Sequence, residues 1–127
     1  MILNIFSSGS AILNYHRVCE DKYFPKNNDA LVVSVSKFKE QLTFLKKNFN
    51  LVSLEKILRF ESGKKSNICI TFDDGYKDNL THALPILTEL NIPATIYIVT
   101  KFYENDFSIW WTELHDFIWQ KSKRCQY

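Results

Sequence analysis

Two adjacent carboxylates, Asp73 and Asp74, are the side chains of this sequence best placed to do chemistry. They follow the apolar run 67–72 directly and precede Gly75, which permits a sharp turn of the chain. Two neighbouring carboxylates repel each other, so keeping both ionised is unfavourable unless a cation or strong hydrogen-bond donors offset the charge. The pair therefore favours a divalent metal site. A purely structural interpretation stays open, in which Asp73 caps the next helix and Asp74 lies in a turn.

The segments around this pair alternate between strand and helix patterns. Strand patterns occupy residues 10–18, 51–53, 67–72 and 94–99, and the run 67–72 is apolar on both faces, which is typical of a central parallel strand. Such a series predicts an α/β fold with a parallel sheet. Ligands gather at the carboxyl ends of parallel strands, where Asp73 and Asp74 lie and where His16 ends the first strand.

Apolar side chains at helical spacing predict the connecting helices. We expect a helix capped by Ser36, a short helix over 54–58 that ends near Gly63, and a helix over 76–90 with a kink at Pro85. The expected buried faces are Phe38, Leu42, Leu45 and Phe49 in the first helix and Leu80, Ala83, Leu84, Leu87 and Leu90 in the third.

Length and composition restrict the class of protein. The 127 residues are 46% hydrophobic with only 3 Gly and 3 Pro, so they can form a core, but a (β/α)8 barrel takes roughly 250 residues. The formal charge of +2 does not point to nucleic acid or an anionic membrane as partner. Cys19, Cys69 and Cys125 form neither a disulfide framework nor a thiolate zinc site, and Cys69 is expected in the core. No signal-peptide pattern or membrane-length apolar run is visible, so the default expectation is a cytoplasmic protein.

Two phosphate-related interpretations are tested by spacing. The run that ends in Asp73 and Asp74 is similar to a Walker B strand, but Gly9, Gly63 and Gly75 cannot supply a Walker A loop. A phosphatase of the haloacid dehalogenase type needs two aspartates separated by one residue, whereas here they are contiguous. This second interpretation stays a weaker alternative.

The hexapeptide Thr71-Phe72-Asp73-Asp74-Gly75-Tyr76 resembles the first motif of the polysaccharide deacetylases, the NodB-homology domains of carbohydrate esterase family four. Residues 13–18, 83–87, 92–95 and 110–114 are similar to further family segments, so the resemblance runs from about Ala11 to about Phe117. It implies the N-terminal part of a distorted (β/α) barrel of the NodB-homology or glycoside hydrolase–deacetylase type, with about four parallel strands. It also implies a metal-dependent hydrolase that removes N-acetyl or O-acetyl groups from a polysaccharide.

The resemblance further implies a role for four side chains. Asp73 would be the general base and Asp74 a ligand of a divalent metal ion, usually zinc, which lowers the pKa of its bound water toward roughly 7. His16 and Tyr76 would line the site.

The family's His-Ser/Thr-x-x-His motif has no counterpart here, because no two of His16, His82 and His115 lie four positions apart. We therefore expect residues 1–127 to be a partial domain, truncated after the first motif and inactive by itself, with 101–127 as an amphipathic tail that carries Trp110, Trp111 and Trp119. The alternative is a non-catalytic remnant that binds a glycan or a partner chain. An exposed strand edge or the Trp-rich face would serve such association.

Overall fold

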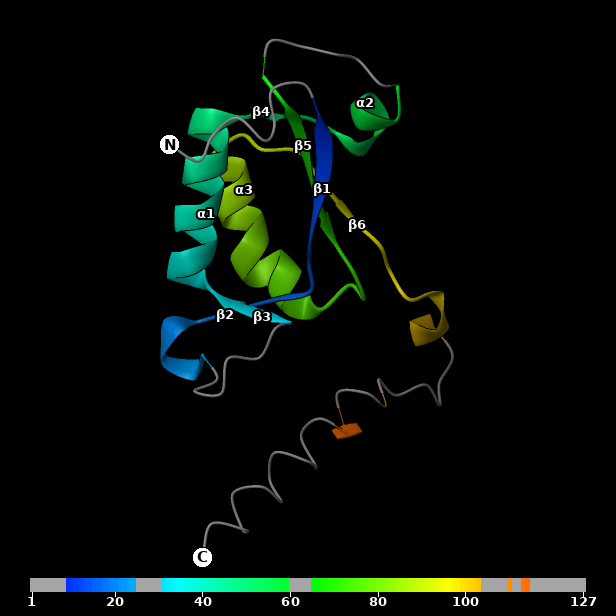
Figure 1. Cartoon of the computed structure of the whole chain (residues 1–127). Coiled ribbons are helices and arrows are strands. Elements are labelled where there is room, and N and C mark those ends of the chain that lie inside the picture. Colours follow the sequence, from blue (N-terminus) through cyan, green and yellow to red (C-terminus); the bar gives the residue numbers. More distant parts are fainter. Residues whose placement is uncertain (1–8, 25–30, 60–64, 104–109, 111–112, 115–127) are drawn as a thin grey trace, which may run out of the picture.

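A parallel sheet built around strand β5 (Asn67–Phe72) organises the chain in the computed structural model, which describes residues 9–24, 31–59, 65–103, 110 and 113–114 (Figure 1). Strand β1 (Ser10–Tyr15) pairs with the whole of β5 along one edge. The other edge is shared, because β4 (Asn50–Leu51) pairs with the start of β5 and β6 (Ala94–Ile96) with its end. The expected parallel sheet of four strands is confirmed, and it forms part of a distorted barrel.

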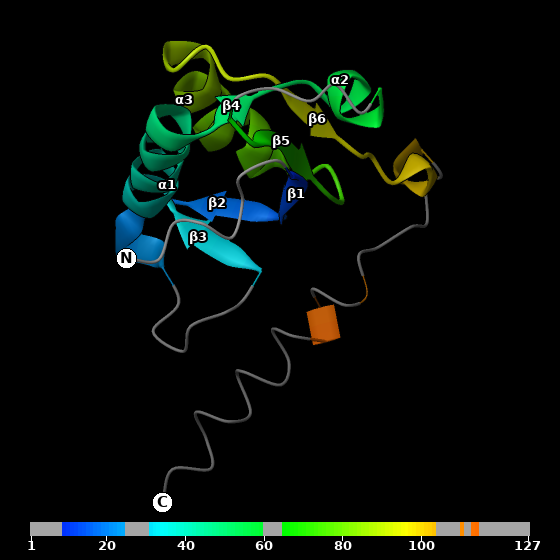
Figure 2. The same cartoon turned by 45° about the horizontal axis from the view of Figure 1, so that its top comes forward.

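The two faces of β5 are covered by different helices, which explains its apolar run. All six residues of β5 are buried. Helices α1 (Val35–Asn48) and α3 (Leu84–Glu89) cover one face, and the short helix α2 (Leu54–Leu58) lies on the other side of the sheet (Figures 1 and 2). The larger core includes Phe38, Leu42, Ile70, Phe72 and Leu87, whereas Cys69 packs with Val52 and Ile57 on the side of α2. The expectation that Cys69 is a core residue is confirmed.

The first predicted strand is broken at His16. Residues beyond the break form β2 (Arg17–Cys19), which pairs in parallel with β3 (Val32–Ser34) in a separate sheet of two strands. The 3-10 turn η1 (Asp21–Tyr23) follows β2. The sequence did not predict β3, because three residues are too few to establish an alternating pattern.

Helix α1 begins two residues earlier than the sequence predicts. Its N-cap is Ser34, whose Oγ accepts a hydrogen bond from the backbone N–H of Lys37 at 3.4 Å. Ser36 lies inside the first turn, and its hydroxyl donates to Asp21 instead. Phe38, Leu42 and Leu45 are buried as expected, whereas Phe49 is a half-buried residue at the C-cap.

The predicted helix over 76–90 is not continuous. A π-helical turn, η2 (Asn79–Ala83), precedes α3, and Pro85 lies in the first turn of α3. Proline has no N–H to donate to the carbonyl four residues earlier, and a wider turn rotates the side chains that precede it. The predicted buried face is therefore wrong at Leu80 and Leu84, which are 64% and 45% exposed. Ala83 and Leu87 are buried as predicted, and Asn79 and Ile86 are buried in addition.

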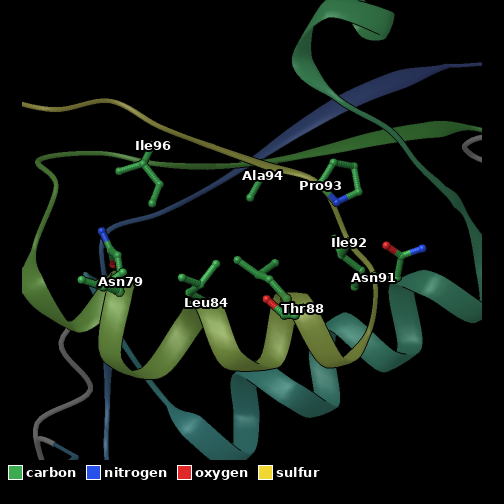
Figure 3. Close-up of a pocket in the computed structure, with 10 residues that line it drawn as sticks. Asn79, Leu84, Thr88, Asn91, Ile92, Pro93, Ala94 and Ile96 are labelled. Carbon is green, nitrogen blue, oxygen red and sulfur yellow. The ribbon is translucent and has the colours of Figure 1, made fainter.

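Strand β6 is a short edge strand and not the buried strand predicted over 94–99. Ala94 and Ile96 are exposed, because within the described residues only β5 pairs with β6. An apolar groove of about 420 Å³ separates β6 from η2 and α3. Leu84 lines it opposite Ile96, and Thr88 lines it opposite Ala94 (Figure 3).

The chain continues from β6 into a 3-10 turn, η3 (Thr100–Tyr103). Most of the predicted tail over 101–127 lies outside the described residues, together with Gly63, His115, Trp111, Trp119 and Cys125. Trp110 is described, and 61% of its surface is exposed. None of the described helices is long and apolar enough to cross a membrane.

Candidate active site

A tight turn places the two carboxylates at the carboxyl end of β5. The backbone N–H of Asp73 donates to the carbonyl of Tyr15 at 3.0 Å, so the pairing with β1 continues one residue past the strand. Asp74 and Gly75 then both adopt φ of 67°, in the left-handed region. Aspartate tolerates this region better than most residues, and glycine adopts it without strain. The sharp turn expected at Gly75 is present.

The carboxylate of Asp73 is bound from β1. Its Oδ2 accepts a hydrogen bond from Nδ2 of Asn14 at 2.6 Å, and Nε2 of His16 lies 3.8 Å from the same oxygen. The side chain of Asp73 is 40% exposed, so solvent and a substrate can reach it. The structure thus brings His16 and Asp73 together. Within the described residues, Asp73 makes no hydrogen bond that would cap the following helix.

Behind this turn, a second set of contacts joins the β1–β2 junction to the residues that follow Gly75. Arg17 donates through Nε to Oδ2 of Asp78 at 3.0 Å, and the backbone N–H of Val18 donates to Oδ1 at 3.3 Å. The buried Asn79 amide, oriented with its nitrogen toward acceptors, donates to the carbonyl of His16 at 2.9 Å.

The guanidinium carbon of Arg17 lies 5.0 Å from the centre of the Tyr76 ring, a cation–π contact. Tyr76 therefore packs beside the site and supports Arg17.

Sequence reasoning missed Asn14, Arg17, Asp78 and Asn79. Asn14 carried a usable signal, since it is a polar residue in a strand that begins with apolar side chains. The other three give no local signal, because their partners lie about sixty positions away in the chain.

His82 lies in a different environment from the carboxylate pair. The hydrogen bond and charge of Lys22 hold the pKa of Glu20 below its usual value, and the charge of His82 adds a small contribution in the same direction. His82 therefore acts electrostatically on Glu20, and within the described residues no hydrogen bond or ion pair joins it to Asp73 or Asp74.

The described residues do not form a metal site by themselves. Among them, no group of three or more His, Cys, Asp or Glu side chains converges on one point. A catalytic zinc ion normally has three protein ligands. Asp74 could supply one carboxylate, and a complete ligand set needs side chains other than those described.

A parallel sheet that carries exposed carboxylates at its carboxyl edge is the usual architecture of α/β enzymes. Residues 61–126, just over half of the chain, match the polysaccharide deacetylase family. The chain belongs to this family.

The relatives agree with this assignment. The chain is 32% identical over 112 residues to the poly-beta-1,6-N-acetyl-D-glucosamine N-deacetylase of Staphylococcus epidermidis, a match that covers 76% of this chain and 38% of that protein. The deacetylase PplD of Streptococcus pyogenes, solved in complex with acetate, superposes with a TM-score of 0.64 and 26% identity over 80% of this chain and 48% of that one. A polysaccharide deacetylase from Bacillus cereus gives a TM-score of 0.59 and 25% identity over 81% of this chain and 33% of that one. The chain spans about a third of the length of the curated relatives it matches.

Proposed function

We propose that this chain is the part of a polysaccharide deacetylase that supplies the general base, Asp73, and one ligand of a divalent metal ion, Asp74. The observation that carries the proposal is the Asp73 carboxylate, which is exposed at the carboxyl end of the central strand and whose Oδ2 is bound by Asn14. The proposed substrate is an N-acetylated glycan, and the family match supports this substrate class.

In the proposed reaction, Asp73 takes a proton from the water molecule that attacks the acetyl carbonyl. The new carbon–oxygen bond gives a tetrahedral intermediate. Its collapse breaks the carbon–nitrogen bond while a general acid from another part of the protein protonates the leaving nitrogen, which releases acetate and an amino sugar. A base must lie within hydrogen-bond reach of the water it deprotonates. The side chain of Asp73 is 40% exposed, and this accessibility to water supports the proposed role.

The metal dependence of the reaction is part of the proposal. Asp74 follows the base directly, and the left-handed conformation at Asp74 and Gly75 turns the chain, so the two neighbouring carboxylates need not point to opposite faces of a strand. Because the described residues do not complete a ligand set, we propose that partner ligands come from other parts of the protein, that zinc is the ion, and that residues 1–127 are inactive alone.

Activity of the full gene product on an N-acetylated oligosaccharide tests the role of Asp73. The Asp73→Asn variant should lose turnover by about 100-fold or more, because general-base catalysis contributes roughly 10²–10⁴-fold. Zinc binding should change little, since Asp73 acts on water. The matched control is Glu89→Gln, which neutralises an exposed carboxylate on α3 and should leave turnover unchanged. Normal turnover of Asp73→Asn would refute the assignment.

The non-catalytic alternative is favoured by one observation, the absence of three converging ligands among the described residues. Calorimetric titration of the full gene product with zinc separates the two proposals. Tight binding that Asp74→Ala abolishes supports the enzyme, whereas no binding, together with retained affinity for a glycan, supports the remnant.

We also propose that the chain associates through an exposed strand edge. Within the described residues, β1 and β6 each pair only with β5, and Ile12 and Ile96 are 50% and 41% exposed. Unpaired edges favour association. Sedimentation velocity of the 127-residue chain over a concentration series should show self-association; a monomer at all concentrations would contradict it.

A further inference from the structure

Asn14 holds the carboxylate of Asp73 from the neighbouring strand. The two side chains are 59 positions apart in the sequence, yet Nδ2 of Asn14 lies only 2.6 Å from Oδ2 of Asp73. Hydrogen bonds to an ionised carboxylate are shorter and stronger than those between neutral groups. This contact therefore restricts the rotation of the carboxyl group that the proposed function assigns as the base.

The orientation of the Asn14 amide is itself determined by Thr71. These two residues are direct partners in the pairing of β1 with β5, and the hydroxyl of Thr71 donates to Oδ1 of Asn14 at 2.9 Å. Thr71 is 3% exposed, and a buried hydroxyl needs a hydrogen-bond partner. With Oδ1 occupied by this donor, Nδ2 is the amide atom that faces Asp73. A reversed amide would place Oδ1 against a carboxylate oxygen, where two acceptors repel.

The contacts of Asp73 are distributed unequally between its two oxygens. Asn14 and His16 both approach Oδ2, and within the described part of the chain Oδ1 accepts no hydrogen bond. A carboxylate that acts as a base needs a lone pair directed at the attacking water. The two hydrogen bonds, from Thr71 to Asn14 and from Asn14 to Oδ2 of Asp73, leave Oδ1 of Asp73 available for the attacking water.

We propose that Asn14 is a positioning residue that holds Asp73 by Oδ2 and so directs Oδ1 toward the attacking water, and that Thr71 orients Asn14. This inference rests on the proposed function, because it concerns the base assigned there. Neither side chain touches substrate in the proposal; each acts through Asp73.

Kinetics of the full gene product on an N-acetylated oligosaccharide tests the role of Asn14. Asn14→Leu should lower kcat about 10- to 100-fold with KM unchanged, because small misplacements of a reacting group cost up to about 10²-fold. The matched control is Asn50→Leu, which removes a bond of the same kind between β4 and β5, from Nδ2 of Asn50 to Oδ1 of Asn67 at 2.8 Å. This control lies at the opposite end of β5 and should keep full kcat.

Variants of Thr71 test whether the hydroxyl acts through Asn14. Thr71→Val keeps the shape and removes the donor, so kcat should fall, whereas Thr71→Ser keeps the donor and should retain kcat. The double variant Asn14→Leu/Thr71→Val should be no slower than Asn14→Leu alone. The effects of substitutions are not additive when one residue acts through the other. Additive losses would overturn the role of Thr71.

The outcomes separate this inference from the function on which it rests. Full turnover of Asp73→Asn would overturn the base assignment and the positioning role with it. Loss of turnover in Asp73→Asn with normal kcat in Asn14→Leu would overturn the positioning role alone.

A measurement on the 127-residue chain needs no activity. Exchange of the Asn14 side-chain amide protons with water, followed by nuclear magnetic resonance, should accelerate in Thr71→Val and stay unchanged in Asn50→Leu. Unchanged exchange in Thr71→Val would contradict the orientation of Asn14 by Thr71.

Discussion

The guanidinium of Arg17 binds the carboxylate of Asp78, with Nε 3.0 Å from Oδ2, and so joins β2 to the segment that follows the Asp-Asp-Gly turn. The same carboxylate accepts the backbone N–H of Val18, and the neighbouring Asn79 binds the carbonyl of His16. The β1–β2 junction and the turn after β5 are therefore held as one unit. His16 belongs to this unit through its carbonyl, and its Nε2 lies 3.8 Å from Oδ2 of Asp73.

Removing the Asp78 carboxylate should destabilise the fold. Asp78 is only 14% exposed, so Asp78→Ala leaves the Val18 N–H without its acceptor and breaks the pair with Arg17. We expect a loss of about 1–3 kcal/mol in the free energy of unfolding, measured by urea denaturation. Glu89→Ala, which breaks the exposed pair with Lys39, should cost less than about 1 kcal/mol. Equal effects of the two variants would contradict the bracing role of Asp78.

Gly75→Ala should strain the turn through the backbone. Gly75 has φ of 67°, and an added Cβ would lie 3.4 Å from Cγ1 of Ile98, an ordinary contact. The cost is therefore the left-handed conformation, about 1–2 kcal/mol for a residue with a Cβ. Asparagine tolerates this conformation better, so Gly75→Asn should lose less stability. Gly9→Ala is the control, because nothing lies within 4 Å of its added Cβ. Thermal unfolding should give the lowest melting temperature for Gly75→Ala, a higher one for Gly75→Asn and the highest for Gly9→Ala. An unchanged melting temperature in Gly75→Ala would exclude the predicted strain.

The contact of Asp21 with α1 should make stability depend on pH. Hydrogen bonds from the side chains of Ser36 and, to a lesser degree, Ser34 hold the pKa of Asp21 below its ordinary value of 3.8. A lowered pKa in the folded state stabilises the protein above the unfolded pKa, and this contribution disappears as the pH falls below about 4. The urea midpoint should thus fall more between pH 5 and pH 3 in the wild type than in Asp21→Asn.

A second variant provides the matched control for this pH dependence. Ser36→Ala removes the hydroxyl that donates to Asp21 and leaves the Asp21 carboxylate in place. The urea midpoint of this variant should therefore change less between pH 5 and pH 3 than that of the wild type. If the wild type and both variants respond alike to acid, Asp21 is not the responsible group.

The central strand and the turn at its end could be predicted from the sequence because their signals are local. A run that is apolar on both faces implies a strand covered on both sides, and β5 is covered by α1 and α3 on one face and α2 on the other. The Asp73-Asp74-Gly75 turn follows the strand directly, and the family motif lies in the same continuous stretch. Helical spacing likewise predicted the buried residues Phe38, Leu42 and Leu45.

Predictions failed where a distant contact or one backbone irregularity decides the outcome. A continuous helical period predicted Leu80 and Leu84 to be buried, but the π-helical turn before Pro85 rotates them outward. The capping serine of α1 was misassigned by two residues, because Ser34 and Ser36 both have a suitable hydroxyl and the choice depends on the contact of Ser36 with Asp21.

The sequence by itself determined that a buried parallel strand ends in a pair of carboxylates, because the pattern of apolar residues and the motif are properties of neighbouring positions. Only the tertiary structure decided what surrounds that pair: Asn14 on one oxygen of Asp73, His16 beside it, and the brace between Arg17 and Asp78. The physical reason is that these contacts follow from the register of β1 against β5 and from the break after β1. The register of β1 and the break at His16 both depend on packing between segments about sixty positions apart. A pattern of neighbouring residues carries no information about such packing.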